Sequence, residues 1–394
     1  MKKKLLKFCL SAGTLFLLIG LECLGHEYKD AVLEKVAASL VKNACLVSRA
    51  SQGNQLVRLA AGNWMFFSLD SPDTLAGNSR VYWENRGGGQ LSEGELAEAE
   101  NEAEIQSSGN ASAVVSENLA QVQAAGGAGS GTAAYVNKLR ENKDVNYLWN
   151  HFYIIDSTTS VTKSLFDVDK MLKRNMTIKQ KPGSKQILIY HTHGASEAFC
   201  DSRKGRESDS VIGVGTVLAK ELEKNGYSVY HDKTKYDWIN GSIDRSKAYN
   251  TSLEGIQRIM SQNPDIQVTI DLHRDSVGKN KHTYTMIDGK KTAIVMFFNG
   301  LSRSKSGKID YLFNPNLEAN LSFSLQLKCH AMETYDGFTK PVYLKGYRYN
   351  LHVAERALLI ELGNENNTVE EAKNAAGPLA KVIADVLKGE VTGF

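Results

Sequence analysis

Apolar runs alternate with amphipathic stretches along the C-terminal part of the chain. Short apolar runs bounded by polar or turn residues predict buried β-strands. These runs cover residues 186–193, 227–232, 266–275, 292–299 and 356–364. Stretches in which apolar residues recur at helical spacing predict α-helices. These stretches cover residues 209–226, 252–264, 320–335 and 368–389.

Residues that stop helices support this division. Asn225-Gly226 follows the first helix as a C-cap, and Pro264 ends the second. Strands and helices alternate at the spacing of βαβ units. The alternation predicts an α/β fold with a mostly parallel sheet and helices on both faces. Ligands of such folds bind beyond the carboxyl ends of the strands.

Residues 1–25 have the pattern of a targeting segment. Lysines precede the stretch 8–21, which carries no charge. This apolar stretch is shorter than the roughly 20 residues of a membrane-spanning helix, and residues 23–25 resemble a cleavage site. A cleaved secretory signal and a short uncleaved anchor both fit. Either interpretation predicts that the rest of the chain is extracytoplasmic, secreted or held at the membrane by its N-terminus.

Two further regions precede the α/β domain. Residues 26–86 are amphipathic and aromatic, and they predict a small helical region. Residues 87–134 contain no Lys or Arg, carry a glutamate-rich run and end in a Gly/Ala-rich run. This composition predicts a flexible acidic linker. The catalytic domain is therefore expected over residues 135–394.

Charge and cysteine content exclude some classes of function. The net charge is only +3, and the basic residues are dispersed, so we expect no nucleic-acid partner. The five cysteines are far apart, which is neither a disulfide framework nor a zinc-ribbon spacing.

Three of the predicted strands end in ionisable side chains, mostly imidazoles and carboxylates. The three groups are His191, His193 and Glu197; Asp271, His273, Arg274 and Asp275; and Glu361. Because the carboxyl ends of parallel strands meet at one edge of a sheet, we expect these groups to lie together. Two imidazoles and one carboxylate are the ligand set of a catalytic Zn²⁺. The sequence therefore predicts a zinc site at this edge.

A further carboxylate is needed as general base and then as acid. Glu361 suits that role, because burial in an apolar strand would raise its pKa. Glu207 is a rival for the carboxylate ligand. Arg274, Arg348 and Asn350 are candidates for binding a substrate carboxylate or carbonyl.

Five motifs together resemble the stage II sporulation protein P family over residues 180–392. They are IYHTHGASEAF, DSVIGVGTVLAKEL, IDLHRD, KGYRYNLH and LLIELGNENNTVEEA. The resemblance implies a zinc-dependent peptidoglycan hydrolase. Such an enzyme cuts the amide between N-acetylmuramic acid and L-alanine, and also stem-peptide cross-links. It would act with stage II sporulation proteins D and M in septal wall thinning and engulfment.

The resemblance also implies roles for individual residues, because the family is related to zinc-dependent N-acetylmuramoyl-L-alanine amidases. His193, which precedes a glycine, and His273 match metal ligands, and Glu361 matches the catalytic glutamate. His191 would be a neighbouring catalytic residue or an alternate ligand. The third ligand matches Glu197 in the sporulation family and Glu207 in the amidases, and we favour Glu197.

Two other functions fit the same residues less well. One is a non-catalytic, membrane-anchored scaffold that binds the cell wall. The other is a metallopeptidase that acts on a different amide.

Overall fold

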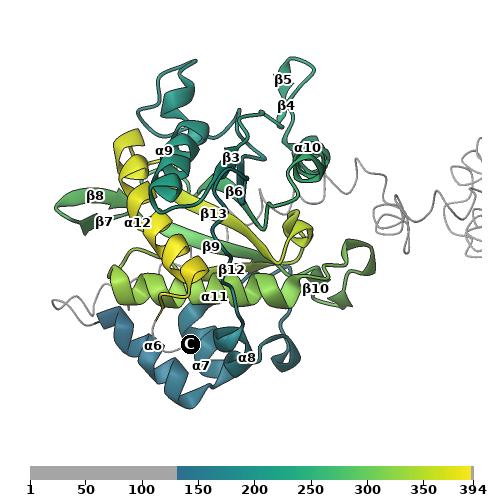
Figure 1. Cartoon of the computed structure of the whole chain (residues 1–394), viewed down its shortest axis with the longest axis vertical. Coiled ribbons are helices and arrows are strands. Elements are labelled where there is room, and N and C mark those ends of the chain that lie inside the picture. The colour runs from purple at the N-terminus through teal and green to yellow at the C-terminus, as the bar shows by residue number, and fades with distance from the viewer. Residues whose placement is uncertain (1–130, 392–394) are drawn as a thin grey trace, which may run out of the picture. The chain divides into compact units, whose positions relative to one another are not determined.

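The structure is a computed structural model that describes residues 131–391 (Figure 1). The expected targeting segment, the small helical region and almost all of the linker lie outside the described residues. Helix α6 (Gly131–Asn142) begins four residues before the expected domain boundary. Within the described range, no helix combines the length and the apolar character needed to cross a bilayer.

A seven-stranded sheet forms the centre of the domain, in the order β1-β12-β9-β13-β6-β2-β3. In chain order its strands are β1 (Tyr153–Ile155), β2 (Ile187–Tyr190), β3 (Val229–His231), β6 (Val268–Asp275), β9 (Val295–Gly300), β12 (Val342–Lys345) and β13 (Arg356–Asn364). Every neighbouring pair is parallel except β9 and β13, which are antiparallel. The sheet therefore consists of two parallel blocks of opposite direction, and the expectation of a mostly parallel sheet is confirmed.

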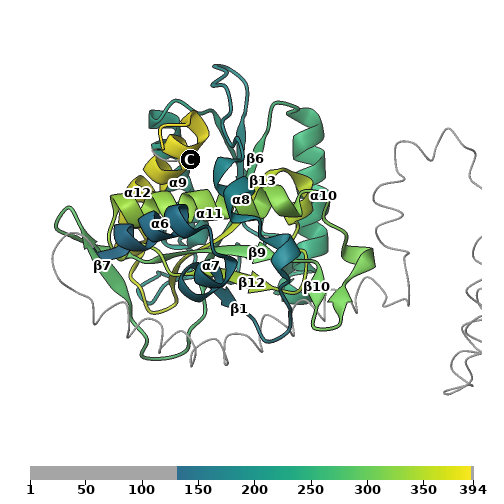
Figure 2. The ribbon, with the colours of Figure 1, turned by 90° about the horizontal axis from the view of Figure 1, so that it is seen from below.

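Helices cover both faces of this sheet, as expected. Besides α6 they are α7 (Val145–Phe152), α8 (Val168–Lys173), α9 (Val211–Lys224), α10 (Ala248–Gln262), α11 (Leu317–Thr334) and α12 (Val369–Lys388). The main core lies between the sheet and α9, α11 and α12, where Ile189 and Ile360 pack with Leu218 and Leu379. Helix α10 packs on the other face through Ile256, and Figure 2 shows it apart from α11 and α12.

Local sequence explains where the helices begin and end. Thr368 and Glu371 form a capping box at the start of α12, which satisfies backbone N–H groups that the first turn leaves without partners. Helix α9 ends at Asn225, and Gly226 has a φ of +95°, so the predicted glycine stop is confirmed. Helix α10 begins at Ala248, four residues before the predicted start.

Two predicted strands differ from the structure in their extent. The run at 186–193 stops being a strand after Tyr190, and the chain turns from Thr192 onward. The run at 292–299 is divided between β8 (Lys290–Ala293) and β9. Strand β8 pairs with β7 (Tyr284–Ile287) in a separate hairpin. The apolar run continues from one strand into the next, so hydrophobicity alone does not show where the hairpin ends and the central sheet resumes.

Two more short hairpins project from the domain. Strands β10 (Arg303–Ser304) and β11 (Gly307–Lys308) pair in one of them. Strands β4 (Trp238–Ile239) and β5 (Ser242–Ile243) pair in the other, which Figure 1 shows beside α10. Its turn residues Asn240 and Gly241 have φ values of +51° and +83°, and positive φ at both positions is typical of a type I′ turn.

Candidate active site

The strands that carry the predicted site residues are direct neighbours. Strand β6 pairs in parallel with β13 on one side and with β2 on the other. Their carboxyl ends therefore meet at one edge, as expected. Glu361 and His273 are register partners, so their side chains leave neighbouring strands on the same face.

The alternation of side chains along β6 shows which face of the sheet carries the site residues. Ile270 and Leu272 point into the main core. Asp271 and His273 alternate with them and so point to the face that α10 covers. The candidate site therefore lies at the sheet edge beneath the start of α10.

His273 is the centre of a buried polar cluster. Its Nδ1 lies 3.2 Å from Oε1 of Glu197, and its Nε2 lies 2.9 Å from Oδ1 of Asp271. The ring of His193 stands edge-on, with its centroid 5.4 Å from that of His273. All four side chains are buried. The structure thus brings together the three expected zinc ligands, His193, Glu197 and His273, and Asp271 from the same predicted strand end.

Further hydrogen bonds hold Asp271 in place. Thr192 donates its backbone N–H to Oδ1 at 2.9 Å and its hydroxyl to Oδ2 at 2.6 Å. Ser252 of α10 contacts the Thr192 hydroxyl at 3.1 Å, and Asn350 donates to the Ser252 hydroxyl at 3.1 Å. These links fix the carboxylate of Asp271, which faces Nε2 of His273, and carboxylates beside metal-binding histidines orient them in this way.

Charge in this cluster is strongly coupled. Burial lowers the pKa of His273, but the carboxylates of Asp271 and Glu197 outweigh burial and hold that pKa well above its usual range. Burial raises the pKa of Glu197, but His273 and Arg245 outweigh it, and the pKa is lowered. Glu197 and His273 are therefore a carboxylate–imidazolium pair in the structure. The same excess of carboxylate charge would favour a divalent cation.

The loop that carries His193 and Glu197 is held from several sides. Glu197 accepts the backbone N–H of Arg274 at 3.0 Å. The buried carboxylate of Asp237 accepts the N–H of Ala195 at 2.8 Å and that of Ser196 at 3.0 Å. Sequence reasoning missed Asp237, and the signal that was available is the Asn-Gly turn three residues later, which marks a hairpin.

Glu361 occupies the expected position but is less enclosed than expected. It is half-buried, whereas the sequence predicts burial. Met296 is its register partner on the antiparallel side, and His273 is its partner on the parallel side. Glu361 therefore leaves β13 beside His273, on the face that α10 covers.

His191 lies on the other face of the sheet. Ile187 and Ile189 point into the main core, and His191 continues their alternation. Its Nδ1 donates to the carbonyl of Leu272 at 2.8 Å, and its Nε2 is 2.9 Å from Nε2 of His231. Burial lowers the pKa of His191 to about 4. These contacts are those of a neutral structural histidine, and they give its predicted catalytic role no support.

The other predicted residues occupy different environments. Glu207 is exposed, 3.4 Å from Lys233, so the structure places Glu197 and not its rival beside His273. The guanidinium of Arg274 donates to the carbonyl of Ala198 at 2.8 Å. These contacts tie Arg274 to the site loop, and substrate binding by it stays a prediction.

Arg348 and Asn350 approach the site from the chain before β13. Arg348 is buried and donates to the carbonyl of Phe313 at 3.4 Å. Asn350 has a φ of +55° and donates to the carbonyl of Tyr249, in the first turn of α10, at 2.8 Å. Tyr249 stands edge-on to His193, with ring centroids 5.5 Å apart. Asn350 thus supports the site through α10, and binding of substrate by either residue stays a prediction.

The side chains of His193, Glu197 and His273 match part of what a zinc site requires. Two imidazoles and one carboxylate are a known catalytic set, and two ligands of a tetrahedral zinc stand about 3.4 Å apart. Glu197 and His273 meet that spacing at 3.2 Å. Within residues 131–391, however, no group of three or more His, Cys, Asp or Glu side chains has the arrangement of a complete metal site. His193, Glu197 and His273 therefore fit zinc in chemistry and burial, although they are not gathered around one point.

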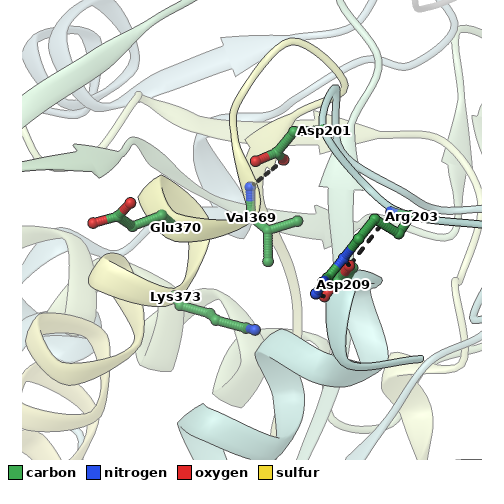
Figure 3. Close-up of a pocket in the computed structure, with 6 residues that line it drawn as sticks. All are labelled: Asp201, Arg203, Asp209, Val369, Glu370 and Lys373. Carbon is green, nitrogen blue, oxygen red and sulfur yellow. Dashed lines mark hydrogen bonds and ion pairs between the residues drawn. The ribbon is translucent and has the colours of Figure 1, made fainter. Parts of the chain in front are cut away.

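A separate surface pocket lies beyond the site loop. It has a volume of about 470 Å³ and is lined by Asp201, Arg203, Asp209, Val369, Glu370 and Lys373. Asp201 accepts the backbone N–H of Val369 at 2.8 Å, and Figure 3 shows Arg203 against Asp209. Its lining includes none of the predicted site residues.

The sequence of this chain matches a known protein family. The model of the stage II sporulation protein P family matches residues 86–384. The chain belongs to the stage II sporulation protein P family. The stage II sporulation protein P of Bacillus subtilis (strain 168) is 30% identical over 225 residues, which are 53% of this chain and 53% of that protein. The chain thus spans about half the length of the curated relative it matches.

Solved structures with some likeness to this member of the stage II sporulation protein P family include amidases. The N-acetylmuramoyl-L-alanine amidase AmiC2 of Nostoc punctiforme is 11% identical, with a TM-score of 0.30, over 53% of this chain and 98% of that one. The N-acetylmuramoyl-L-alanine amidase of Clostridium difficile 630 is 15% identical, with a TM-score of 0.33, over 52% and 94%. The family assignment rests on the sequence match.

Proposed function

We propose that this chain is an exported, zinc-dependent peptidoglycan hydrolase of sporulation. It would cleave the amide between N-acetylmuramic acid and L-alanine, and also stem-peptide cross-links, during septal wall thinning and engulfment. Membership of the stage II sporulation protein P family supports the biological setting. The reaction is proposed from the chemistry of the site.

One observation carries this proposal. Glu361 is the register partner of His273, and His273 lies between the buried carboxylates of Glu197 and Asp271. A half-buried carboxylate beside two imidazoles, those of His193 and His273, and two further acids is the residue set of a hydrolase that uses an activated water. A protein that only binds the wall has no need for this set.

Each residue of the site has a separate proposed role in the reaction. His193, Glu197 and His273 would hold zinc, which supplies an activated water and polarises a carbonyl when it is bound. Asp271 keeps the ring of His273 in one orientation through its Nε2. Glu361, half-buried at the mouth of the site, accepts a proton from the attacking water and returns it to the leaving amine.

Substrate, partners and location are part of the same proposal. Peptidoglycan is the proposed substrate, and stage II sporulation proteins D and M are the proposed partners. The chain is proposed to work outside the cytoplasm, attached to the membrane by its N-terminus or secreted.

Mass spectrometry of the fragments released from purified sacculi tests the function. With zinc, the full chain should release stem peptides that begin with free L-alanine, and a chelator should stop the release. Glu361→Gln should lower the rate by about 10²–10⁴-fold. Glu318→Gln is a matched control, because Glu318 makes an exposed ion pair with Lys170. This variant should hydrolyse sacculi at the parent rate.

Two results would count against the proposal. If the zinc-loaded chain binds sacculi but releases no fragment, the wall-binding scaffold is the better interpretation. If Glu361→Gln releases the same fragments at the parent rate, Glu361 is not the general base.

A further inference from the structure

The β4–β5 hairpin presents an apolar pair to solvent beside the candidate site. Trp238 and Ile243 are register partners across the hairpin. Trp238 is 53% exposed and Ile243 is 51% exposed. Single exposed apolar residues need no explanation, but here two of them pair across one hairpin that contacts the loop of the candidate site.

Both ends of this hairpin are attached to the loop that carries His193 and Glu197. Before β4, Asp237 binds the backbone N–H groups of Ala195 and Ser196. After β5, Arg245 donates to the hydroxyl of Ser196 at 2.7 Å, and its guanidinium lies 3.7 Å from Glu197. The strands that carry the apolar pair are therefore fastened at both ends to the loop of His193 and Glu197.

The hairpin also holds its own shape. Asp244 donates its N–H to the carbonyl of Asp237 at 2.8 Å and so closes the base. The Asn240-Gly241 turn has the backbone that a type I′ turn requires. Isolated two-stranded hairpins are only marginally stable, so the contacts of Asp237 and Arg245 with the site loop add to the stability of this one. A fixed surface binds a ligand with a smaller loss of conformational entropy.

The size and chemistry of the patch indicate a small, flat ligand unit. A Trp side chain has roughly 250 Å² of surface, so half of it and half of an Ile present on the order of 200 Å². A stable protein interface buries about 800 Å² on each partner, which is far more. A pyranose ring has C–H groups on its faces and hydroxyls at its edge, so it packs flat on an indole while the hydroxyls stay in water.

We propose that the β4–β5 hairpin binds the glycan strand of the substrate, with Trp238 stacking on a sugar ring and Ile243 beside it. This inference rests on the proposed function, because it takes peptidoglycan as the substrate. The hairpin holds the polymer at the edge of the site and thereby places the stem-peptide amide near His193 and Glu361. Trp238 is a binding residue and not a catalytic one.

Binding to glycan strands stripped of their stem peptides tests the inference directly. The full chain carrying Glu361→Gln is mixed with these strands, and the bound fraction is measured by co-sedimentation. Trp238→Ala in this background should weaken binding about tenfold, which corresponds to about 1.4 kcal/mol. Trp238→Phe keeps an aromatic face and should retain most of the binding, which excludes misfolding as the cause.

Tyr284→Ala is the matched control. Tyr284 is a 40% exposed aromatic residue on the β7–β8 hairpin, which Figure 1 shows on a different side of the domain from the β4–β5 hairpin. This variant should bind glycan like its parent.

Two results would overturn the inference. They are unchanged glycan binding by Trp238→Ala and equal weakening by Tyr284→Ala. If Trp238→Ala keeps its glycan binding but loses self-association, the patch is a contact between copies of the chain. Failure of the proposed hydrolysis is a different result. It appears as missing fragments in mass spectrometry, whereas the binding assay needs no cleavage.

Discussion

Replacing Asp237 with asparagine tests whether this buried carboxylate holds the candidate site together. Asp237 is fully buried and accepts N–H groups of Ala195 and Ser196 at 2.8 and 3.0 Å. Asparagine keeps the shape but has one oxygen, so its NH₂ group would face one of these N–H groups. A hydrogen bond to a charged acceptor contributes about 1.5–3 kcal/mol, and an unsatisfied buried donor costs about 1–3 kcal/mol. We expect Asp237→Asn to lower the free energy of unfolding by about 2–4 kcal/mol.

Equilibrium unfolding in urea measures this effect. The transition midpoint should fall while the slope stays the same, because the surface exposed on unfolding is unchanged. Asp265→Asn is the matched control. The Asp265 carboxylate pairs with Lys181 at 2.7 Å on the surface, and such pairs contribute at most about 1 kcal/mol.

A second readout separates the site from general stability. Because Asp237 positions the loop that carries two proposed ligands, Asp237→Asn should also weaken zinc binding about 10–100-fold. Equal effects of Asp237→Asn and Asp265→Asn on unfolding would refute the reasoning, since they would mean that the buried carboxylate is worth no more than a surface ion pair.

Three further substitutions test other parts of the structure. Glu197→Gln should reduce the zinc bound per chain, as measured by metal analysis, while Glu207→Gln should leave it unchanged; the reverse pattern would make Glu207 the ligand. Gly215→Ala should destabilise the domain by about 1–3 kcal/mol, because a Cβ there would lie 2.6 Å from the ring of His191; a urea midpoint at or above that of the parent would contradict this. Burial lowers the pKa of Lys328 to about 7, so between pH 7 and 10.5 the unfolded chain holds more protons and stability rises with pH. Lys328→Met should remove about 1–2 kcal/mol of that rise between pH 7 and 8.5 in urea unfolding, and an unchanged pH dependence would exclude Lys328 as its source.

The sequence predicts one half of the site well, because that half depends on strand ends. Parallel strands bring their carboxyl ends to one edge whatever lies between them. His273 and Glu361 could therefore be placed together from two short apolar runs, although the two residues are far apart in the chain. Asp271 belongs to the same predicted strand end, and alternation places it on the face of His273, two positions before it.

The rest of the site, the loop of His193 and Glu197, depends on tertiary contacts. Such contacts leave no repeating pattern in the sequence. His191 and His193 look equivalent in a strand, but the chain turns at Thr192 and sends them to opposite faces. The tight fit of Gly194 against Ile212, with a virtual Cβ at 3.0 Å, belongs to that turn. Asp237 binds this loop from about 40 positions away, and nothing in either segment indicates the other.

The placement of β13 has a consequence for how this domain is made. Strand β13, at Arg356–Asn364, stands between β9 and β6, yet it follows the other six strands of this sheet in chain order. Without β13, the other six strands would form two half-sheets, each with an open edge where β13 pairs in the folded domain. Such edges readily pair with other chains, and joining them requires contacts between distant segments, which form slowly. A chain cut before residue 356 would lack Glu361 and would leave both edges exposed, so we expect such a fragment to aggregate.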